Sequence, residues 1–142
     1  MGEDRSGGHL VGAPALTQYS RVKAAGGLLF VAGISSRQPD NSVKGAGRDA
    51  AGALITDVRA QTEGAIENLS AVLAGWGATL EDVVDVTVFL IDMADYRGFN
   101  ETWNRYFTTA GPARTTVAVH QLPDAQLIVE LKAIARQPTG RA

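Results

Sequence analysis

One stretch of this sequence, residues 56–90, changes from a helical to a strand-like apolar period within a few residues. Apolar side chains recur at helical spacing from Val58 to Trp76, which predicts an amphipathic helix over residues 56–75 with Thr56 or Asp57 as its N-cap. A capped turn at residues 79–82 leads into residues 83–90, where apolar and polar side chains alternate. This alternation predicts a strand covered on one side only, whose covered face consists of Val84, Val86, Val88 and Leu90.

The other periodic segments build a layered fold around this helix and strand. Aromatic side chains at helical spacing predict a second helix at Tyr96–Phe107, and we interpret them as packing residues rather than as a platform for stacked bases. An ordered loop is expected over residues 35–47. The expected strands span residues 19–23, 28–32, 115–120 and 126–136, and the first two form a hairpin. The order β-β-α-β-α-β-β predicts an α+β fold with two helices on one face of a mixed sheet.

The length and the polar start of the chain set its expected organisation. A chain of 142 residues is expected to hold one domain over residues 19–138, after an arm over residues 1–18 with a short edge pairing near residues 9–11, and before a tail over residues 139–142. The start lacks the apolar stretch of a secretory signal, and no cysteine is present, which together predict a cytoplasmic protein. No apolar run has the length of a membrane span.

The inventory of charged and metal-binding residues disfavours several functions. The absence of cysteine excludes thiolate catalysis and cysteine-bound metals, and His9 and His120 lie too far apart for a helical two-histidine metal site. The net charge is −2 and the cations are scattered, whereas nucleic-acid binding needs a basic stripe. Gly45–Gly47 does not match a phosphate-binding loop. We therefore expect neither a metal nor a nucleotide cofactor, and no nucleic-acid or membrane partner.

The sheet face opposite the helices is expected to mix apolar and polar side chains. The apolar residues of this face are Phe89, Ile128 and Ile134, and its polar residues are Asp85, Thr87, Thr116, Glu130 and Lys132. Such a face is too apolar for exposure to water alone, and closed cyclic oligomers bury surfaces of this kind. The sequence therefore predicts a homo-oligomer with functional clefts between its subunits.

Two charged residues near the closing strands are the main candidates for chemistry. Arg114 follows Gly111–Ala113 at a strand start, where it is either a surface cation or an anchor for a small organic acid. Glu130 interrupts the apolar run from Leu127 to Leu131, where it is either an outward-facing strand residue or a working acid/base. Desolvation in that run is expected to raise the pKa of Glu130.

Other polar residues are weaker candidates because each has a common structural role. Tyr19 offers a hydroxyl at a strand start, Asn100 lies on the aromatic helix, and His120 is either a proton carrier or a packing residue. Ser35, Ser36 and Arg37 follow a glycine-ended strand and make a plausible oxyanion-binding turn.

Several motifs occur in order across residues 17–137. They are GPARTTVAV at 111–119, Leu122-Pro123 and IVELKAIA at 128–135, preceded by Tyr19, FVAG at 30–33, IENL at 66–69, DVVDVTVFL at 82–90, and Tyr96 to Phe107 with Asn100. Together they closely resemble the signature of the RidA family, also called the YjgF family.

This resemblance implies a fold, an assembly and an activity. The fold is chorismate-mutase-like, and a homotrimer forms a central barrel with three clefts between neighbouring subunits. Family members hydrolyse enamines and imines next to a carboxylate, without a metal or organic cofactor. The arginine that grips the carboxylate falls on Arg114, and the glutamate linked to the hydrolytic water falls on Glu130. Cleft-lining residues fall on Tyr19, Gly33 and Asn100, while Thr116 stands where the family often has cysteine.

Residues 35–41, SSRQPDN, differ from the generic family loop and resemble the 2-aminomuconate deaminase branch. That branch converts 2-aminomuconate to 4-oxalocrotonate, also drawn as 2-hydroxymuconate, and ammonia in the degradation of aromatic compounds. A muconate carries two carboxylates, and Arg37 with Ser35 or Ser36 would bind the second one, with His120 a weaker candidate.

Three other functions remain open on the sequence. The first is a general 2-imino or enamino acid deaminase of the same family, which needs one carboxylate-binding group. The second is an RNA-binding translation inhibitor or ribonuclease, which the charge distribution disfavours. The third is a ligand-binding regulator without turnover.

Overall fold

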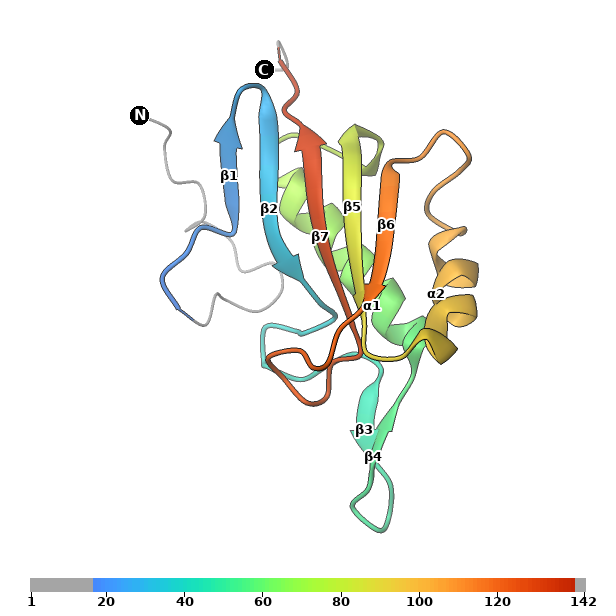
Figure 1. Cartoon of the computed structure of the whole chain (residues 1–142). Helices are drawn as coiled ribbons and strands as arrows, with labels where there is room; N and C mark the ends of the chain where they lie inside the picture. Colours follow the sequence, from blue (N-terminus) through green and yellow to red (C-terminus); the bar gives the residue numbers. More distant parts are fainter. Residues whose placement is uncertain (1–16, 140–142) are drawn as a thin grey trace.

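The computed structural model describes residues 17–139, in which a mixed sheet carries two helices on one face (Figure 1). The elements are β1 (Val22–Ala25), β2 (Leu28–Ile34), β3 (Ala46–Arg48), β4 (Leu54–Thr56), α1 (Val58–Ala74), β5 (Val83–Leu90), α2 (Tyr96–Trp103), β6 (Ala113–Ala118) and β7 (Val129–Arg136), with 3-10 turns at Leu80–Asp82 and Met93–Asp95. Within the described residues the main sheet has the order β1-β2-β7-β5-β6, and only β6 runs parallel to its neighbour. The predicted fold class is confirmed.

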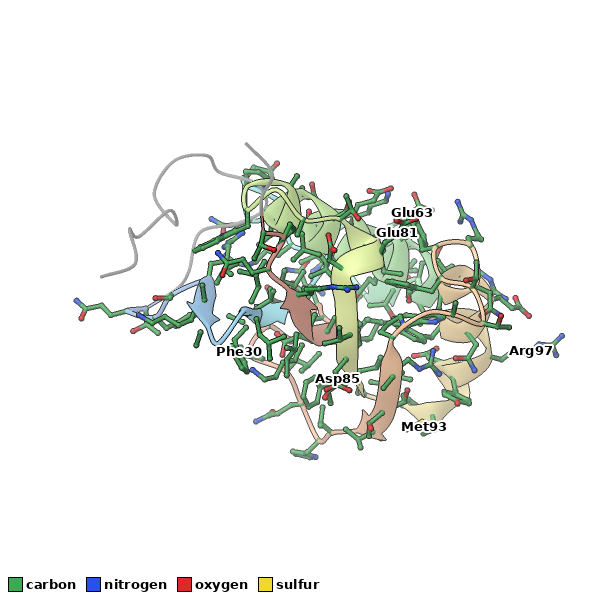
Figure 2. The ribbon with its side chains drawn as sticks, turned by 90° about the horizontal axis from the view of Figure 1, so that it is seen from above. Phe30, Glu63, Glu81, Asp85, Met93 and Arg97 are labelled. Carbon is green, nitrogen blue, oxygen red and sulfur yellow. The ribbon has the colours of Figure 1, made fainter. Side chains whose placement is uncertain are left out.

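Alternation along the central strands separates a buried face from an open one. On the buried face, Leu29, Val31, Val88, Val129 and Leu131 pack against Ile66, Leu69 and Leu73 of α1. Seen from above, Figure 2 shows Glu63 of α1 on the helix side of the sheet and Phe30 and Asp85 on the other side. Phe30 is 39% exposed and Val117 is 38% exposed, so the open face presents apolar surface to solvent in the protomer.

The predicted local signals account for several helix starts and turns, although the first strand spans Val22–Ala25 and not residues 19–23. Asp57 is the N-cap of α1 and accepts hydrogen bonds from Arg59 N and Ala60 N. Thr79 forms the expected capping box with Asp82 ahead of β5. The β1–β2 hairpin turns at Gly26 and Gly27, whose φ angles of 60° and 79° favour glycine. The expected pairing near residues 9–11 lies outside the described residues.

Two predicted face assignments are wrong. A register shift between Val83 and Asp85 places Val83 in the core and leaves Val84 41% exposed, because the irregularity reverses the alternation before it. Thr116 pairs with the fully buried Val88, so it lies on the helix-covered face and not on the open one.

Other differences concern element ends and one additional hairpin. The second helix ends at Trp103 rather than at Phe107. Phe107 is nevertheless buried, and its ring stacks on that of Trp103 with 4.2 Å between the ring centroids, as expected of packing residues. The closing strands begin at Ala113 and Val129 instead of residues 115 and 126. The ribbon of β3 and β4 was not predicted, because strands of three residues are too short to show a period.

A buried glutamine on α1 fixes the entry to β7. Gln61 has no exposed surface, and its Nε2 donates to Gln126 O at 2.8 Å while its Oε1 accepts from Ile128 N at 2.9 Å. The side-chain amide is thus satisfied by backbone groups of Gln126 and Ile128, four and two residues before Glu130, as a buried polar group requires. No helix within residues 17–139 combines the length and the apolar character needed to cross a membrane.

Candidate active site

Arg114 lies beneath α2 at the edge of the sheet. Its strand position pairs with the fully buried Val86, which directs the side chain to the helix-covered face. The guanidinium carbon lies 5.0 Å from the ring centroid of Trp103, 5.2 Å from that of Phe99 and 5.8 Å from that of Tyr96. Nη2 donates to Asn100 Oδ1 at 2.7 Å and approaches the Tyr96 hydroxyl at 3.4 Å. Aromatic rings and one amide therefore hold the guanidinium in place.

The arginine has no carboxylate partner among residues 17–139. Asn100 and Tyr96 are neutral, so the positive charge is positioned but not neutralised, and donors outside the Nη2 contacts are available to a bound anion. Thr116 lies on the same face two positions along β6, and its buried Oγ1 has no hydrogen-bond partner in the described part of the chain. Both features suit a small carboxylic acid.

The position of α2, and hence of Asn100, depends on close packing against α1. A Cβ added to Gly98 would lie 2.8 Å from Val58 Cγ1 and 2.9 Å from Arg59 Nη1, so glycine permits this approach of the two helices. The absence of a side chain at this position thus lets α2 pack directly on α1.

Glu130 occupies the open face of the sheet. It pairs with Phe89, and it lies so close to Gly33 that an added Cβ would be 3.0 Å from its carboxyl carbon. The absence of a side chain at Gly33 therefore provides the space that the carboxyl group fills. Burial raises the pKa of Glu130 above its ordinary value, as the sequence predicted.

The raised pKa predicts how a Glu130→Gln variant should behave. Because the folded-state pKa lies above the unfolded one, the stability that the protonated carboxyl provides is present at low pH and is lost as pH rises through the folded pKa. We expect Glu130→Gln to raise the melting temperature at pH 7 to 8, with a gain that disappears below the unfolded pKa. Thermal unfolding followed across this pH range measures the difference.

Glu63 offers a control of opposite sign. The pKa of Glu63 is lowered, first by its hydrogen bond from Lys44 at 2.7 Å and then by Arg105, so Glu63→Gln should lose stability at neutral pH and recover it in acid. A Glu130→Gln variant that follows the Glu63→Gln pattern would contradict the assignment of a destabilised carboxylate at position 130.

Arg114 and Glu130 do not meet within one protomer. They project from opposite faces of the sheet, and β5 lies between their strands. One chain alone therefore cannot bring both groups into one site, and a site that contains both needs a second copy of the chain.

The loop after β2 divides its candidate residues into structural and accessible ones. Ser36 has no exposed surface and its hydroxyl donates to Lys44 O at 2.7 Å, so it supports the loop against α1 instead of facing a ligand. Ser35 Oγ accepts from Arg37 N at 3.2 Å, and Arg37 Nη1 donates to Asn41 Oδ1 at 2.7 Å. Asn68 of α1, which sequence reasoning missed, donates to Ser35 O at 2.8 Å and Arg37 O at 3.1 Å.

The two remaining candidates lie on the surface. Tyr19 is 52% exposed ahead of β1. His120 borders a cavity of about 430 Å³ at the connection between β6 and β7, which Ile91, Leu122, Pro123 and Asp124 also line.

The sequence did not predict Tyr96 as a contact of Arg114, because its place in the aromatic stripe indicated packing alone.

The mixed sheet, the two helices on one face and the arginine under the second helix define an α+β protein with a fixed guanidinium at a sheet edge. The family model described as Endoribonuclease L-PSP matches residues 11–137. A RutC family protein of Pyrococcus abyssi is 39% identical over 119 residues, which cover 82% of this chain and 84% of that protein. The chain belongs to this family, which is the RidA (YjgF) family.

Two further matches are a protein sequence and a solved structure. The chloroplastic Reactive Intermediate Deaminase A of Arabidopsis thaliana is 32% identical over 118 residues, covering 82% of this chain and 58% of the relative. The crystal structure of YEO7 from yeast superposes with a TM-score of 0.77 at 30% identity, covering 90% of this chain and 94% of the other.

Proposed function

We propose that this protein is a hydrolytic deaminase of enamine and imine acids. The observation that carries the proposal is the Arg114 guanidinium, held by Asn100 and three aromatic rings and without a carboxylate partner among the described residues. A positioned, unneutralised guanidinium is suited to the carboxylate of a 2-imino acid. The deaminase name of the Arabidopsis relative supports the reaction type.

The proposed reaction needs a carboxylate anchor and one acid/base group. Arg114 holds the carboxylate beside C2 while the enamine tautomerises to the imine. Glu130 takes a proton from a water molecule as the water oxygen bonds to C2 and the π electron pair of the C2=N bond passes to nitrogen, and Glu130 then returns this proton to the nitrogen to give the carbinolamine. Glu130 next takes the hydroxyl proton and passes it to the amino nitrogen, so that the C2–N bond breaks, ammonia leaves and the hydroxyl oxygen becomes the carbonyl oxygen. Burial raises the pKa of the Glu130 carboxyl, and this raised pKa suits the group to taking and returning a proton.

A neighbouring protomer brings the two groups together in this proposal. The open face carries Glu130 amid exposed Phe30 and Val117, and burial of this apolar surface would stabilise an assembly. We propose the homotrimer that the family resemblance implies, with Arg114 of one protomer facing Glu130 of the next.

The particular substrate that we propose is 2-aminomuconate, with 4-oxalocrotonate and ammonia as products formed in the cytoplasm. Its second carboxylate sets it apart from simple 2-imino acids. Arg37 supports this choice because its guanidinium is suited to a second carboxylate, and the hydrogen bond from Asn68 to Arg37 O fixes its loop to α1. A general 2-imino acid deaminase would not need this arginine.

Ammonia release from a small panel of enamine and imine acids tests the proposal. The panel pairs freshly generated 2-aminomuconate with imines of monocarboxylic 2-oxo acids, and both ammonia and the oxo acid are measured. We expect the purified protein to accelerate hydrolysis of 2-aminomuconate above the spontaneous rate, and to act on it faster than on the monocarboxylates. No acceleration with any of them, together with salt-sensitive binding or cleavage of RNA, would replace this proposal by the RNA alternative.

A further inference from the structure

Tyr96, the first residue of α2, is the most exposed of the three aromatic residues around Arg114. Its side chain is 42% exposed, whereas Phe99 and Trp103 are buried, so packing in the core does not account for its position. The Tyr96 hydroxyl lies 3.4 Å from Arg114 Nη2, and the guanidinium carbon lies 5.8 Å from the centroid of the Tyr96 ring. A solvent-accessible phenol therefore stands beside the fixed guanidinium.

The two contacts of Arg114 Nη2 use both of its hydrogens. Nη2 carries two N–H groups, and it donates to Asn100 Oδ1 and to the Tyr96 hydroxyl. A carboxylate that binds a guanidinium through both oxygens needs two parallel N–H donors, either those of Nη1 and Nη2 or those of Nε and Nη2. Each of these pairs includes a hydrogen of Nη2. A carboxylate therefore binds Arg114 through both oxygens only if it replaces one of the two existing contacts.

The contact with Tyr96 is the one that a carboxylate would replace. The hydrogen bond to Asn100 is 2.7 Å long and partly buried, whereas the one to Tyr96 is 3.4 Å long and exposed. The longer bond is the weaker one, and an exposed hydroxyl that loses it regains a partner in water. A carboxylate oxygen on Nη2 would then lie next to the phenol, whose O–H can rotate and donate to it. The hydroxyl thus changes from an acceptor for the arginine to a donor for the ligand.

We propose that Tyr96 is a substrate-binding residue, which donates its hydroxyl hydrogen to the carboxylate that Arg114 holds. The inference rests on the proposed function, because the ligand is the carboxylic acid that a deaminase of enamine and imine acids would bind. The carboxylate then accepts from the guanidinium and from the phenol together, while Asn100 keeps its contact with Nη2. Hydrogen bonds to a charged acceptor are stronger than those between neutral groups, so the exchange favours the bound state.

Binding of butanoate to the assembled wild-type protein and to its Tyr96→Phe variant tests the inference. Butanoate carries one carboxylate and does not absorb where tyrosine and tryptophan do. Tryptophan fluorescence follows its binding, since the Trp103 ring centroid lies 5.0 Å from the guanidinium carbon. Tyr96→Phe removes only the hydroxyl, and we expect its dissociation constant for butanoate to be about tenfold higher, as for the loss of a hydrogen bond to a charged group.

A spectroscopic readout separates donation to the ligand from an indirect effect on Arg114. A phenol that becomes a hydrogen-bond donor absorbs at longer wavelength, so butanoate should produce a red-shifted tyrosine difference band in the wild type that Tyr96→Phe lacks. Weaker binding by Tyr96→Phe without this band in the wild type would assign the effect to the position of Arg114 and overturn the donor role.

Tyr106→Phe is the matched control. Its ring centroid lies 5.7 Å from the guanidinium carbon of Arg105, not beside Arg114, so the variant loses the same hydroxyl group outside the site. It should bind butanoate within about twofold of wild type, with melting curves of both variants showing folded proteins. Binding by Tyr96→Phe that is equal to or tighter than that of the wild type would overturn the inference, as would a wild type without saturable butanoate binding.

The butanoate titration and the turnover assay fail separately. Absence of ammonia release from every enamine acid, together with weaker butanoate binding by Tyr96→Phe, would overturn the proposed function and retain the inference. Turnover of an enamine acid by both proteins, with equal butanoate affinity in the wild type and in Tyr96→Phe, would retain the deaminase and overturn the role of the phenol.

Discussion

Replacing Arg114 by alanine is expected to lower kcat/KM for an enamine acid by about a hundredfold or more, which corresponds to roughly 2.7 kcal/mol of lost transition-state stabilisation. The guanidinium is the positive charge that the structure places under α2, and Asn100 cannot replace it because a neutral amide lacks both the charge and the paired donors. Steady-state measurement of ammonia release with 2-aminomuconate and with a monocarboxylic imine gives the value. We expect a loss with both substrates, since both carry the carboxylate next to C2.

Two substitutions help to interpret the Arg114→Ala result. Arg114→Lys keeps the charge but not the planar fork, and should recover only part of the activity. Arg97→Ala removes an exposed arginine of α2 that pairs with Glu101 at 3.0 Å, and should change kcat/KM by less than about twofold. If Arg114→Ala remains within about twofold of wild type while its melting curve is unchanged, the arginine is not the carboxylate anchor.

Mixing two inactive variants is expected to restore activity. Arg114→Ala and Glu130→Gln chains each lack one half of every cleft, so each homogeneous assembly should retain about 1% of wild-type activity or less. In a randomly mixed trimer, about a quarter of the clefts would combine Arg114 from one chain with Glu130 from the next. The mixture should therefore recover a substantial fraction of wild-type activity, because the sheet separates the two residues within each chain.

Co-expression of the two chains with different affinity tags isolates the mixed assemblies for this measurement. As a control for effects of purification, each variant is co-expressed with a differently tagged copy of the same variant. Failure of the mixed assembly to exceed both parents would show that the two residues do not complete a site across an interface. Size measured by light scattering establishes that the compared samples have the same number of chains.

Sequence patterns predicted the central elements because those elements bury one face. The helical stripe of α1 and the alternation of β5 and β7 reflect contact with a common core, and Asp57 and Thr79 mark helix starts through their own capping chemistry. Val84 was misplaced because a register shift cannot be deduced from alternation in a single strand.

The local sequence pattern could not predict that Arg114 and Glu130 lie on opposite faces of the sheet. The sequence of β6 is ARTTVA, which has no clear alternation of large apolar and polar side chains, and none of its residues is fully buried in the structure. The sequence therefore did not indicate that Arg114 and Thr116 face the helices. That assignment follows from the parallel register of β6 against β5, which depends on tertiary contacts. Desolvation of Glu130, by contrast, was predictable from the apolar residues on both sides of it.

Placement of Arg114 and Glu130 on opposite faces of one sheet has a consequence for regulation by abundance. Under the proposed function, a freshly synthesised chain is catalytically silent until it meets its copies, so turnover per chain should fall on dilution below the assembly threshold. A cell that makes little of this protein would then gain disproportionately little deaminase activity.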